Sequence, residues 1–126
     1  MKLYITIILL AILMLAAGIF SINSLTETTK DITRNFNNIY QAIDNQEWEA
    51  AETQITKAEQ LWNKHKKWWT VVIDHQEIDN IGVSFAKLGE YIKSRDKALS
   101  SGEFIVLKQF LEHIPEKETI NLKNIL

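Results

Sequence analysis

The chain begins with an uninterrupted apolar run, and this run constrains the fold more than any other feature of the sequence. Residues 3–22 read LYITIILLAILMLAAGIFSI and carry no charge. At ~1.5 Å of rise per residue, a helix of this length spans about 30 Å, the thickness of the hydrocarbon core of a bilayer. Such a helix is apolar on every side, and the rest of the chain is too small to bury it. We therefore expect residues 1–22 to form a membrane anchor and residues 23–126 to form one domain.

A cleaved signal peptide is the alternative explanation of the same run. Ala16-Ala17-Gly18 offers small residues of the kind at which signal peptides are cut. The apolar run continues beyond them through Ile19–Ile22 and is longer than the core of a typical signal peptide. The length favours an uncleaved anchor and hence a single-pass protein of the cell membrane.

The flanking charges bear on orientation. Lys2 and the terminal amine lie closer to the run than Lys30 and Arg34, which follow it. Basic residues near the end of a span favour the cytoplasmic side. This predicts a cytoplasmic N-terminus and an extracytoplasmic C-terminal domain.

Composition excludes several classes of function. Lys2 is the only charge before Glu27, so 13 of the 14 basic residues and all 16 acidic residues follow the run, with a net charge of −3. This mild acidity argues against nucleic acid as a partner, because nucleic-acid binding needs a concentrated basic surface. The chain has no cysteine, so it can form no disulfide, thiolate nucleophile or cysteine zinc site.

The remainder reads as helix almost throughout, since one proline and four glycines leave few breaks. Apolar residues recur at spacings of three and four, which predicts four helices with one buried face each. The first continues the anchor to about Asp44. The predicted inward positions are Ile22, Leu25, Thr29, Ile32, Phe36, Ile39 and Ile43 in the first helix, Trp48, Ala51, Ile55, Ala58, Trp62, His65 and Trp69 in the second, Ile78, Ile81, Phe85, Leu88 and Ile92 in the third, and Phe104, Leu107, Leu111 and Ile114 in the fourth.

Three capping boxes mark the predicted starts of the second, third and fourth helices. These are residues 44–47, 74–77 and 100–103, each with an acceptor side chain three residues before a glutamate. Pro115 is expected to end the fourth helix or to begin a short fifth segment. Gly82 and Gly89 are expected to mark close packing of the third helix. The predicted fold is all-α: a transmembrane helix continuous with a small antiparallel bundle of about four helices, arranged as two αα-hairpins.

Helix lengths predict which part of the bundle lies near the membrane. Residues 23–44 would rise about 33 Å from the bilayer, and the antiparallel second helix would return the stretch KHKKWWTVVI to membrane level. Tryptophan and lysine both favour the membrane interface. The candidate contacts with the membrane or a partner are Lys64, Lys67, Trp68, Trp69, Val71, Val72 and Ile73. In the competing interpretation Trp69 is core, Trp68 is half-covered and residues 70–73 are simply a strained corner between helices.

One pair of residues could carry metal chemistry. His75 and Asp79 lie four apart on one helical face and could bind a divalent ion with His65 or His113 as a third ligand. Helix capping explains the neighbouring acidic residues equally well, and the last-turn position explains His113. We therefore predict no catalytic, cofactor-binding or metal-binding residue, and no cofactor.

The residues also resemble a known family. The segments NQEWEAAE, WNKHKKWW, IDHQEIDNI, FAKLGEYI and HIPEKETINLKNIL occur in the order found in the bacterial family catalogued as domain of unknown function 4363. On this resemblance the family's signature positions are Trp48, Trp69, Asp74, His75, Glu77, Asp79, His113, Pro115 and Glu116. The family is one of small single-pass membrane proteins without an established activity. The resemblance implies, as a possible partner, a small multi-pass membrane protein of the YetF kind.

Three functions follow as expectations. The first is a non-enzymatic, membrane-anchored accessory protein that docks on a membrane protein partner or on the lipid surface. The second is an extracytoplasmic sensor or small-ligand module in which Trp48, Trp62 and Tyr91 line a groove. The third is a metal-dependent enzyme that uses His75 and Asp79.

Overall fold

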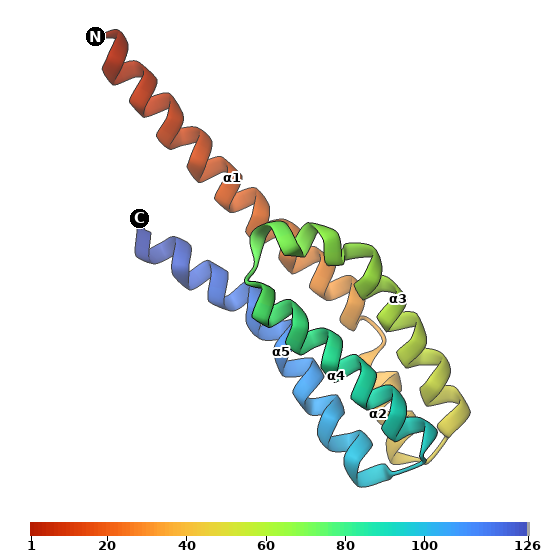
Figure 1. Ribbon diagram of the computed structural model, residues 1–126. Helices are drawn as coiled ribbons and strands as arrows, with labels where there is room; N and C mark the ends of the chain where they lie inside the picture. Colours follow the sequence, from red (N-terminus) through yellow and green to blue (C-terminus); the bar gives the residue numbers. More distant parts are fainter. Residues whose placement is uncertain (126) are drawn as a thin grey trace.

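The computed structural model describes residues 1–125, and the side chains of residues 1–124. The predicted domain, residues 23–126, therefore ends one residue beyond the described part. Within that part the chain forms five helices and no strand, so the all-α prediction is confirmed (Figure 1). The helices are α1 (Lys2–Thr33), α2 (Phe36–Asp44), α3 (Trp48–Val72), α4 (His75–Lys93) and α5 (Lys97–Ile125).

The helices form an antiparallel bundle with four rows. The second half of α1 and the short helix α2 make the first row, and α3, α4 and α5 make the others (Figure 1). Neighbouring rows contact each other in ring order, and α5 closes the ring against α1 and α2. The first half of α1 projects beyond the bundle as a single rod, and the C-terminal end of α5 lies toward the same end of the molecule (Figure 1).

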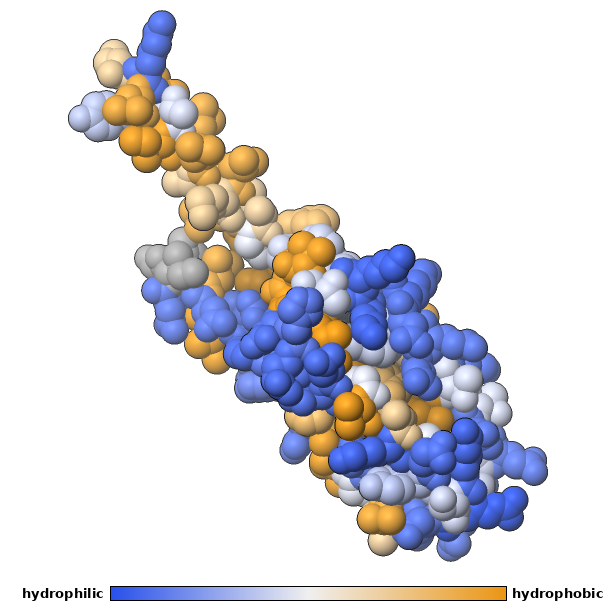
Figure 2. Space-filling view, in the orientation of Figure 1, coloured by the Kyte–Doolittle hydropathy of each residue, from blue (hydrophilic) through white to orange (hydrophobic). Residues whose placement is uncertain are grey.

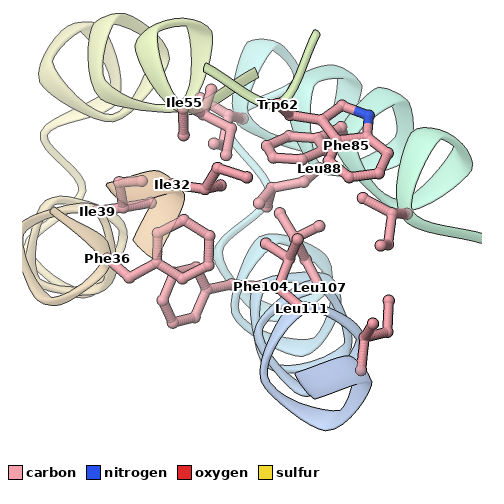
Figure 3. Close-up of a cluster of buried hydrophobic side chains, with 14 of the residues drawn as sticks. Ile32, Phe36, Ile39, Ile55, Trp62, Phe85, Leu88, Phe104, Leu107 and Leu111 are labelled. Atoms are coloured by element: carbon pink, nitrogen blue, oxygen red, sulfur yellow. The ribbon is translucent and has the colours of Figure 1, made fainter. Parts of the chain in front are cut away.

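The core is built from the predicted helix faces. Almost every position predicted to point inward is buried; Ile22, Trp48 and His65 are only partly covered. Figure 3 shows side chains from all four rows meeting in one cluster: Ile32, Phe36 and Ile39 from the first row, Ile55 and Trp62 from α3, Phe85 and Leu88 from α4, and Phe104, Leu107 and Leu111 from α5. The indole of Trp62 stacks on Phe85 at 6.4 Å and meets Trp69 edge-on at 5.2 Å. Helical periodicity thus identified the core correctly.

The first row is not one continuous helix. We predicted a rod from the anchor to about Asp44, but α1 ends at Thr33 and α2 begins at Phe36. The break is at Asn35, whose φ of −103° and ψ of 14° lie in the bridge region outside helical geometry. Ile32 and Phe36 remain buried on either side of the break, so the apolar stripe continues even though the helix does not.

The predicted cap at residues 44–47 is wrong. Asp44 is the last residue of α2, and the corner that follows is a Schellman motif with Gln46 at a φ of 57°. The amide of Glu47 donates to the carbonyl oxygen of Ala42 at 2.8 Å, and the amide of Gln46 donates to that of Ile43 at 3.1 Å. The sequence stretch therefore terminates one helix instead of capping the next.

The predicted cap at residues 100–103 is also wrong, because these residues lie inside α5. The helix begins at Lys97, and the side chain of Asp96 accepts a hydrogen bond from the amide of Leu99 at 2.9 Å. The preceding corner repeats the Schellman geometry, with Arg95 at a φ of 56° and the amide of Asp96 bonded to Tyr91. The two corners at the end of the bundle distant from the rod are therefore built alike.

The cap at residues 74–77 is confirmed at its first residue. Asp74 is the N-cap of α4, and its side chain accepts from the amide of Gln76 at 3.1 Å. Glu77 lies in the first turn but bonds to Lys117 of α5. The acidic pair therefore stabilises both the start of α4 and its contact with α5.

Pro115 and the glycines of α4 also differ from expectation. Pro115 lies inside α5, which continues to Ile125 and changes direction in its last third (Figure 1). A proline removes one helical hydrogen bond and bends a helix without necessarily ending it. Among the described residues, no atom outside the adjacent backbone of α4 lies within 4 Å of a Cβ placed on Gly82 or Gly89, so these glycines do not mark close packing. Gly18 does: a Cβ there would lie 3.1 Å from Cδ1 of Leu122.

Candidate docking surface

The projecting half of α1 is apolar, and none of its residues is buried. The N-terminal helix is long and apolar enough to cross a membrane, and none of the 18 residues of its apolar stretch is buried within the structure. Length and composition alone support this, and a signal sequence passes the same test. Figure 2 shows the apolar surface covering this rod, whereas polar residues cover most of the visible face of the bundle.

Two polar side-chain contacts join the C-terminal part of α3 to α1. The indole Nε1–H of Trp69 donates to Oγ1 of Thr28 at 2.9 Å, and Nε2 of His65 lies 3.3 Å from Oδ2 of Asp31. Trp69 is fully buried. These polar contacts fix the position of α3 along α1, because each can form only in one register.

The predicted contact set divides into a buried part and an exposed part. Trp69 and Ile73 are buried, and Val72 is partly buried against the core. Lys64, Lys67 and Val71 are exposed, and Val71 is 75% exposed. Trp68 is half-buried, with its ring edge-on to Phe20 of α1 at 6.2 Å. The assignment of Trp69 to the core and of Trp68 to a half-covered position therefore describes the structure.

The strained corner proposed for residues 70–73 is much shorter than expected. α3 continues to Val72, and only Ile73 is extended, with a φ of −127° and a ψ of 153°. Lys64, Lys67, Trp68 and Val71 consequently lie on one helix, at positions i, i+3, i+4 and i+7, which share one face. We call this face the α3 foot.

The last turns of α5 approach α1 near the α3 foot. Leu122 packs against Gly18, and a crevice of about 250 Å³ lies between the two helices and the end of α3. Its lining is mostly apolar, with polar groups from α1 and α5: Gly18, Ser21, Ile22, Leu25, Val72, Glu118, Asn121 and Leu122. Residues 18–25 of α1 are therefore packed on the domain by segments from both α3 and α5.

The signature residues do not form one site. Asp74, Glu77 and His113 line a crevice of about 240 Å³ between α4 and α5, and Glu116 lines a neighbouring one. His75 and Asp79 are exposed on α4, and Pro115 is half-buried within α5. Trp48 is half-buried at the first position of α3, at the opposite end of that helix from Trp69.

An ion pair joins two of the segments that carry the family resemblance. Nζ of Lys117, in HIPEKE, bonds to Oε1 of Glu77, in IDHQEID. The hydrogen bond and the negative charge of Glu77 raise the pKa of Lys117 above its ordinary value. This contact gives part of the signature a structural role, that of holding α4 on α5.

The geometry offers little support for the two alternative functions. Among the described residues, no three His, Asp or Glu side chains lie close enough together to hold a metal ion. His65 lies against Asp31 of α1, and His113 lines the crevice between α4 and α5. Within the described part of the chain, neither forms a metal-binding group with His75 and Asp79. Trp62 is buried in the core, so it cannot line an open groove with Trp48 and Tyr91.

Several contributors to these contacts were not predicted. Phe20, Thr28, Asp31 and Lys117 each form a contact described above. Thr28 lies one position before the predicted stripe residue Thr29, and periodicity cannot show that a flanking hydroxyl faces an indole. Lys117 lies in a quoted segment, but only the fold brings it to Glu77.

The fold is thus a helical bundle with one exposed apolar N-terminal helix. The family model described as "Domain of unknown function (DUF4363)" matches residues 19–125. The chain belongs to this family, as the resemblance of its segments predicted. The match begins within the apolar run, so the end of that run and the bundle fall in one family unit. No curated protein and no solved structure matches the chain.

Proposed function

We propose that the chain is a non-enzymatic accessory protein of the cell membrane. The N-terminal half of α1 remains in the bilayer as a single-pass anchor, and the bundle lies on the extracytoplasmic side. There it docks at the membrane as a companion of a membrane protein. The resemblance to the family suggests a small multi-pass protein of the YetF kind as that companion.

The observation that carries this proposal is the continuity of α1. One helix contains the exposed apolar span and also Leu25, Thr29 and Ile32, which are buried in the bundle. Phe20 and Gly18 lie within the span and pack on Trp68 and Leu122 of the domain. A cut after Gly18 would remove the residue on which Leu122 packs, so this contact favours an uncleaved anchor.

The placement of the charged groups supports a binding role over catalysis. Asp74 caps a helix, Glu77 pairs with Lys117, and His65 lies against Asp31. A general acid or base has to reach a substrate in a cleft. These groups are instead used in contacts that hold the helices together.

The test is co-purification from membranes. The full chain and its candidate companion are extracted in a mild detergent, and the tagged chain is followed by size exclusion. Co-elution in a fixed ratio supports the proposal, and free migration of the wild-type chain contradicts it. Val83→Asp places a charge at an exposed valine of α4 and serves as the control. This variant should co-elute like the wild type, whereas its loss would indicate non-specific association of exposed apolar side chains.

A further inference from the structure

We propose that the α3 foot, formed by Lys64, Lys67, Trp68 and Val71, binds the acidic phospholipid headgroups of the leaflet on the bundle's side. This inference deepens the proposed function and depends on its claim that α1 stays in the bilayer. It assigns the lipid surface, and not the protein companion, to this part of the bundle.

The contact between Trp68 and Phe20 sets the depth of the foot. Phe20 lies two residues before the end of the apolar run at Ile22. The ring of Trp68 is 6.2 Å from that of Phe20. With residues 3–22 in the hydrocarbon, Trp68 lies where hydrocarbon gives way to headgroups. Indole rings favour this level of a membrane; for Trp68 the contribution comes from the apolar ring, because its Nε1–H is buried and has no hydrogen-bond partner among the described residues.

The order of residues along α3 matches the layers of a membrane surface. α3 runs antiparallel to α1, so its C-terminal end points toward the bilayer (Figure 1). At ~1.5 Å per residue, Val71 lies about 4.5 Å deeper than Trp68, and Lys64 lies about 6 Å above it. The headgroup layer is about 5–8 Å thick on each side. The exposed side chain of Val71 therefore reaches the apolar layer, while Lys64 and Lys67 lie among the headgroups.

Charge along α3 is separated in the same direction. Residues 61–73 contain Lys64, Lys66 and Lys67 and no carboxylate, whereas Glu49, Glu52 and Glu59 lie in the half far from the rod. The negative end of the helix dipole acts within the last turn, which carries no basic residue, so the dipole does not account for these lysines.

The two lysines of the foot also lack partners within the bundle. Among the described residues, neither Lys64 nor Lys67 forms a salt bridge. Phosphate groups of acidic lipids supply the complementary charge at the depth that the lysines occupy. Each basic residue at an anionic membrane surface raises the equilibrium constant for contact with that surface about fivefold.

The experiment uses the absence of cysteine from the chain. The full-length variant Val71→Cys carries a nitroxide label in liposomes of phosphatidylcholine with phosphatidylglycerol, and collisions with oxygen and with a water-soluble nickel complex are compared. Val83→Cys is the matched control, because Val83 is an exposed valine of α4. We expect the label at position 71 to prefer oxygen and the label at position 83 to prefer the nickel complex.

The lysines are tested in the same labelled chain. Lys64→Gln with Lys67→Gln is expected to lower the ratio of lipid-contacting to aqueous label about 25-fold, since each lysine favours contact about fivefold. Lys57→Gln, an exposed lysine in the far half of α3, is expected to leave the ratio unchanged. Circular dichroism establishes that every variant retains its helix content.

Three results would overturn the inference. First, the label at position 71 could prefer the nickel complex. Second, a second copy of the chain could shield the label from both reagents. Third, the ratio of lipid-contacting to aqueous label could change equally in the double lysine variant and in Lys57→Gln. Alkaline extraction of the same liposomes separates this failure from failure of the proposed function. A chain that remains in the bilayer with an aqueous label contradicts only the foot, whereas a chain that is extracted contradicts the anchor.

Discussion

At the scale of single residues, Trp69 connects the core to the first row of the bundle. Its ring is buried against Trp62, and its indole N–H reaches the hydroxyl of Thr28 on α1. A buried donor that loses its acceptor costs about 1–3 kcal/mol. The hydrogen bond therefore links the correct register of α3 on α1 to stability.

Thr28→Val is expected to lower the free energy of unfolding by about 1–3 kcal/mol, because it keeps the shape of the side chain and removes the acceptor. Chemical unfolding in detergent, followed by circular dichroism, measures the change. Thr26→Val is the matched control, since the hydroxyl of Thr26 bonds only to the carbonyl of Ile22 in its own helix. Equal losses in the two variants would show that the bond between helices contributes nothing.

Two buried serines give a contrast of sign. Ser84 donates to Oε1 of Glu103 at 2.7 Å, whereas the hydroxyl of Ser100 is buried without a hydrogen-bond partner among the described residues. Ser100→Ala should raise the free energy of unfolding by about 1 kcal/mol, and Ser84→Ala should lower it by a similar amount. The reason is that the hydrogen bond of Ser84 offsets the cost of removing its hydroxyl from water, whereas the hydroxyl of Ser100 has no such bond. Thermal unfolding of both variants checks the prediction, and a loss of stability in Ser100→Ala would contradict it.

At the scale of elements, the corners between helices are set by two residues in a left-handed conformation. Gln46 and Arg95 have φ values of 57° and 56°, which disfavour a residue with a Cβ by about 1–2 kcal/mol. Glycine adopts this conformation freely but loses more backbone entropy on folding.

Gln46→Gly and Arg95→Gly should therefore each stabilise the bundle by about 0.5–1 kcal/mol, the relief of strain exceeding the entropic cost. The controls are Asn45→Gly and Ser94→Gly, whose φ values of −83° and −74° need no glycine. Midpoints of chemical unfolding distinguish the two pairs. An equal gain of stability in the controls would contradict strain at Gln46 and Arg95.

The ion pair between α4 and α5 predicts a dependence on pH. Glu77 raises the pKa of Lys117 in the folded chain above the ordinary value of 10.5. The stabilisation is therefore complete below pH 10.5 and is lost as the pH rises through the folded-state pKa. The difference in unfolding free energy between wild type and Lys117→Gln should shrink in that alkaline range, whereas Lys87→Gln should show no such change. A difference that stays constant up to strongly alkaline pH would contradict the pair.

Sequence periodicity predicted the helix faces well because burial requires a repeat of 3.6 residues, and Ile39, Ile81 and Leu107 are fully buried as expected. It predicted the helix ends poorly. Residues 44–47 and 100–103 have the letters of a capping box, but a left-handed corner at Gln46 and a start at Lys97 satisfy the backbone differently. Such ends depend on local backbone geometry, which a pattern of residue types does not determine.

At the scale of the whole molecule, the candidate surface was predicted only in outline. The length of the second helix predicted that residues 64–73 return toward the membrane level, and in the structure Trp68 of this stretch contacts Phe20 of the apolar run. Which members are exposed could not be read from the sequence, because Trp69 and Val71 both belong to one apolar stretch and differ only in the face of α3 that they occupy. The pairings that fix this face, Trp69 with Thr28 and His65 with Asp31, join residues more than thirty positions apart.

The whole molecule behaves, on this account, as one unit that is tethered through α1. Gly18 and Phe20 of the apolar run pack on Leu122 and Trp68 of the bundle, so the proposed anchor and the domain share an interface. A side chain at position 18 would displace Leu122, the closest neighbour of that glycine. We therefore expect the N-terminal anchor and the bundle to remain in the membrane fraction as one intact chain.

The most direct test of this account is the intact mass of the mature chain in membranes washed at alkaline pH. We predict that the chain stays in the membrane pellet and that its mass includes residues 3–22. A chain that begins after Gly18, or that is released by the wash, would contradict the proposed anchor and with it the accessory function.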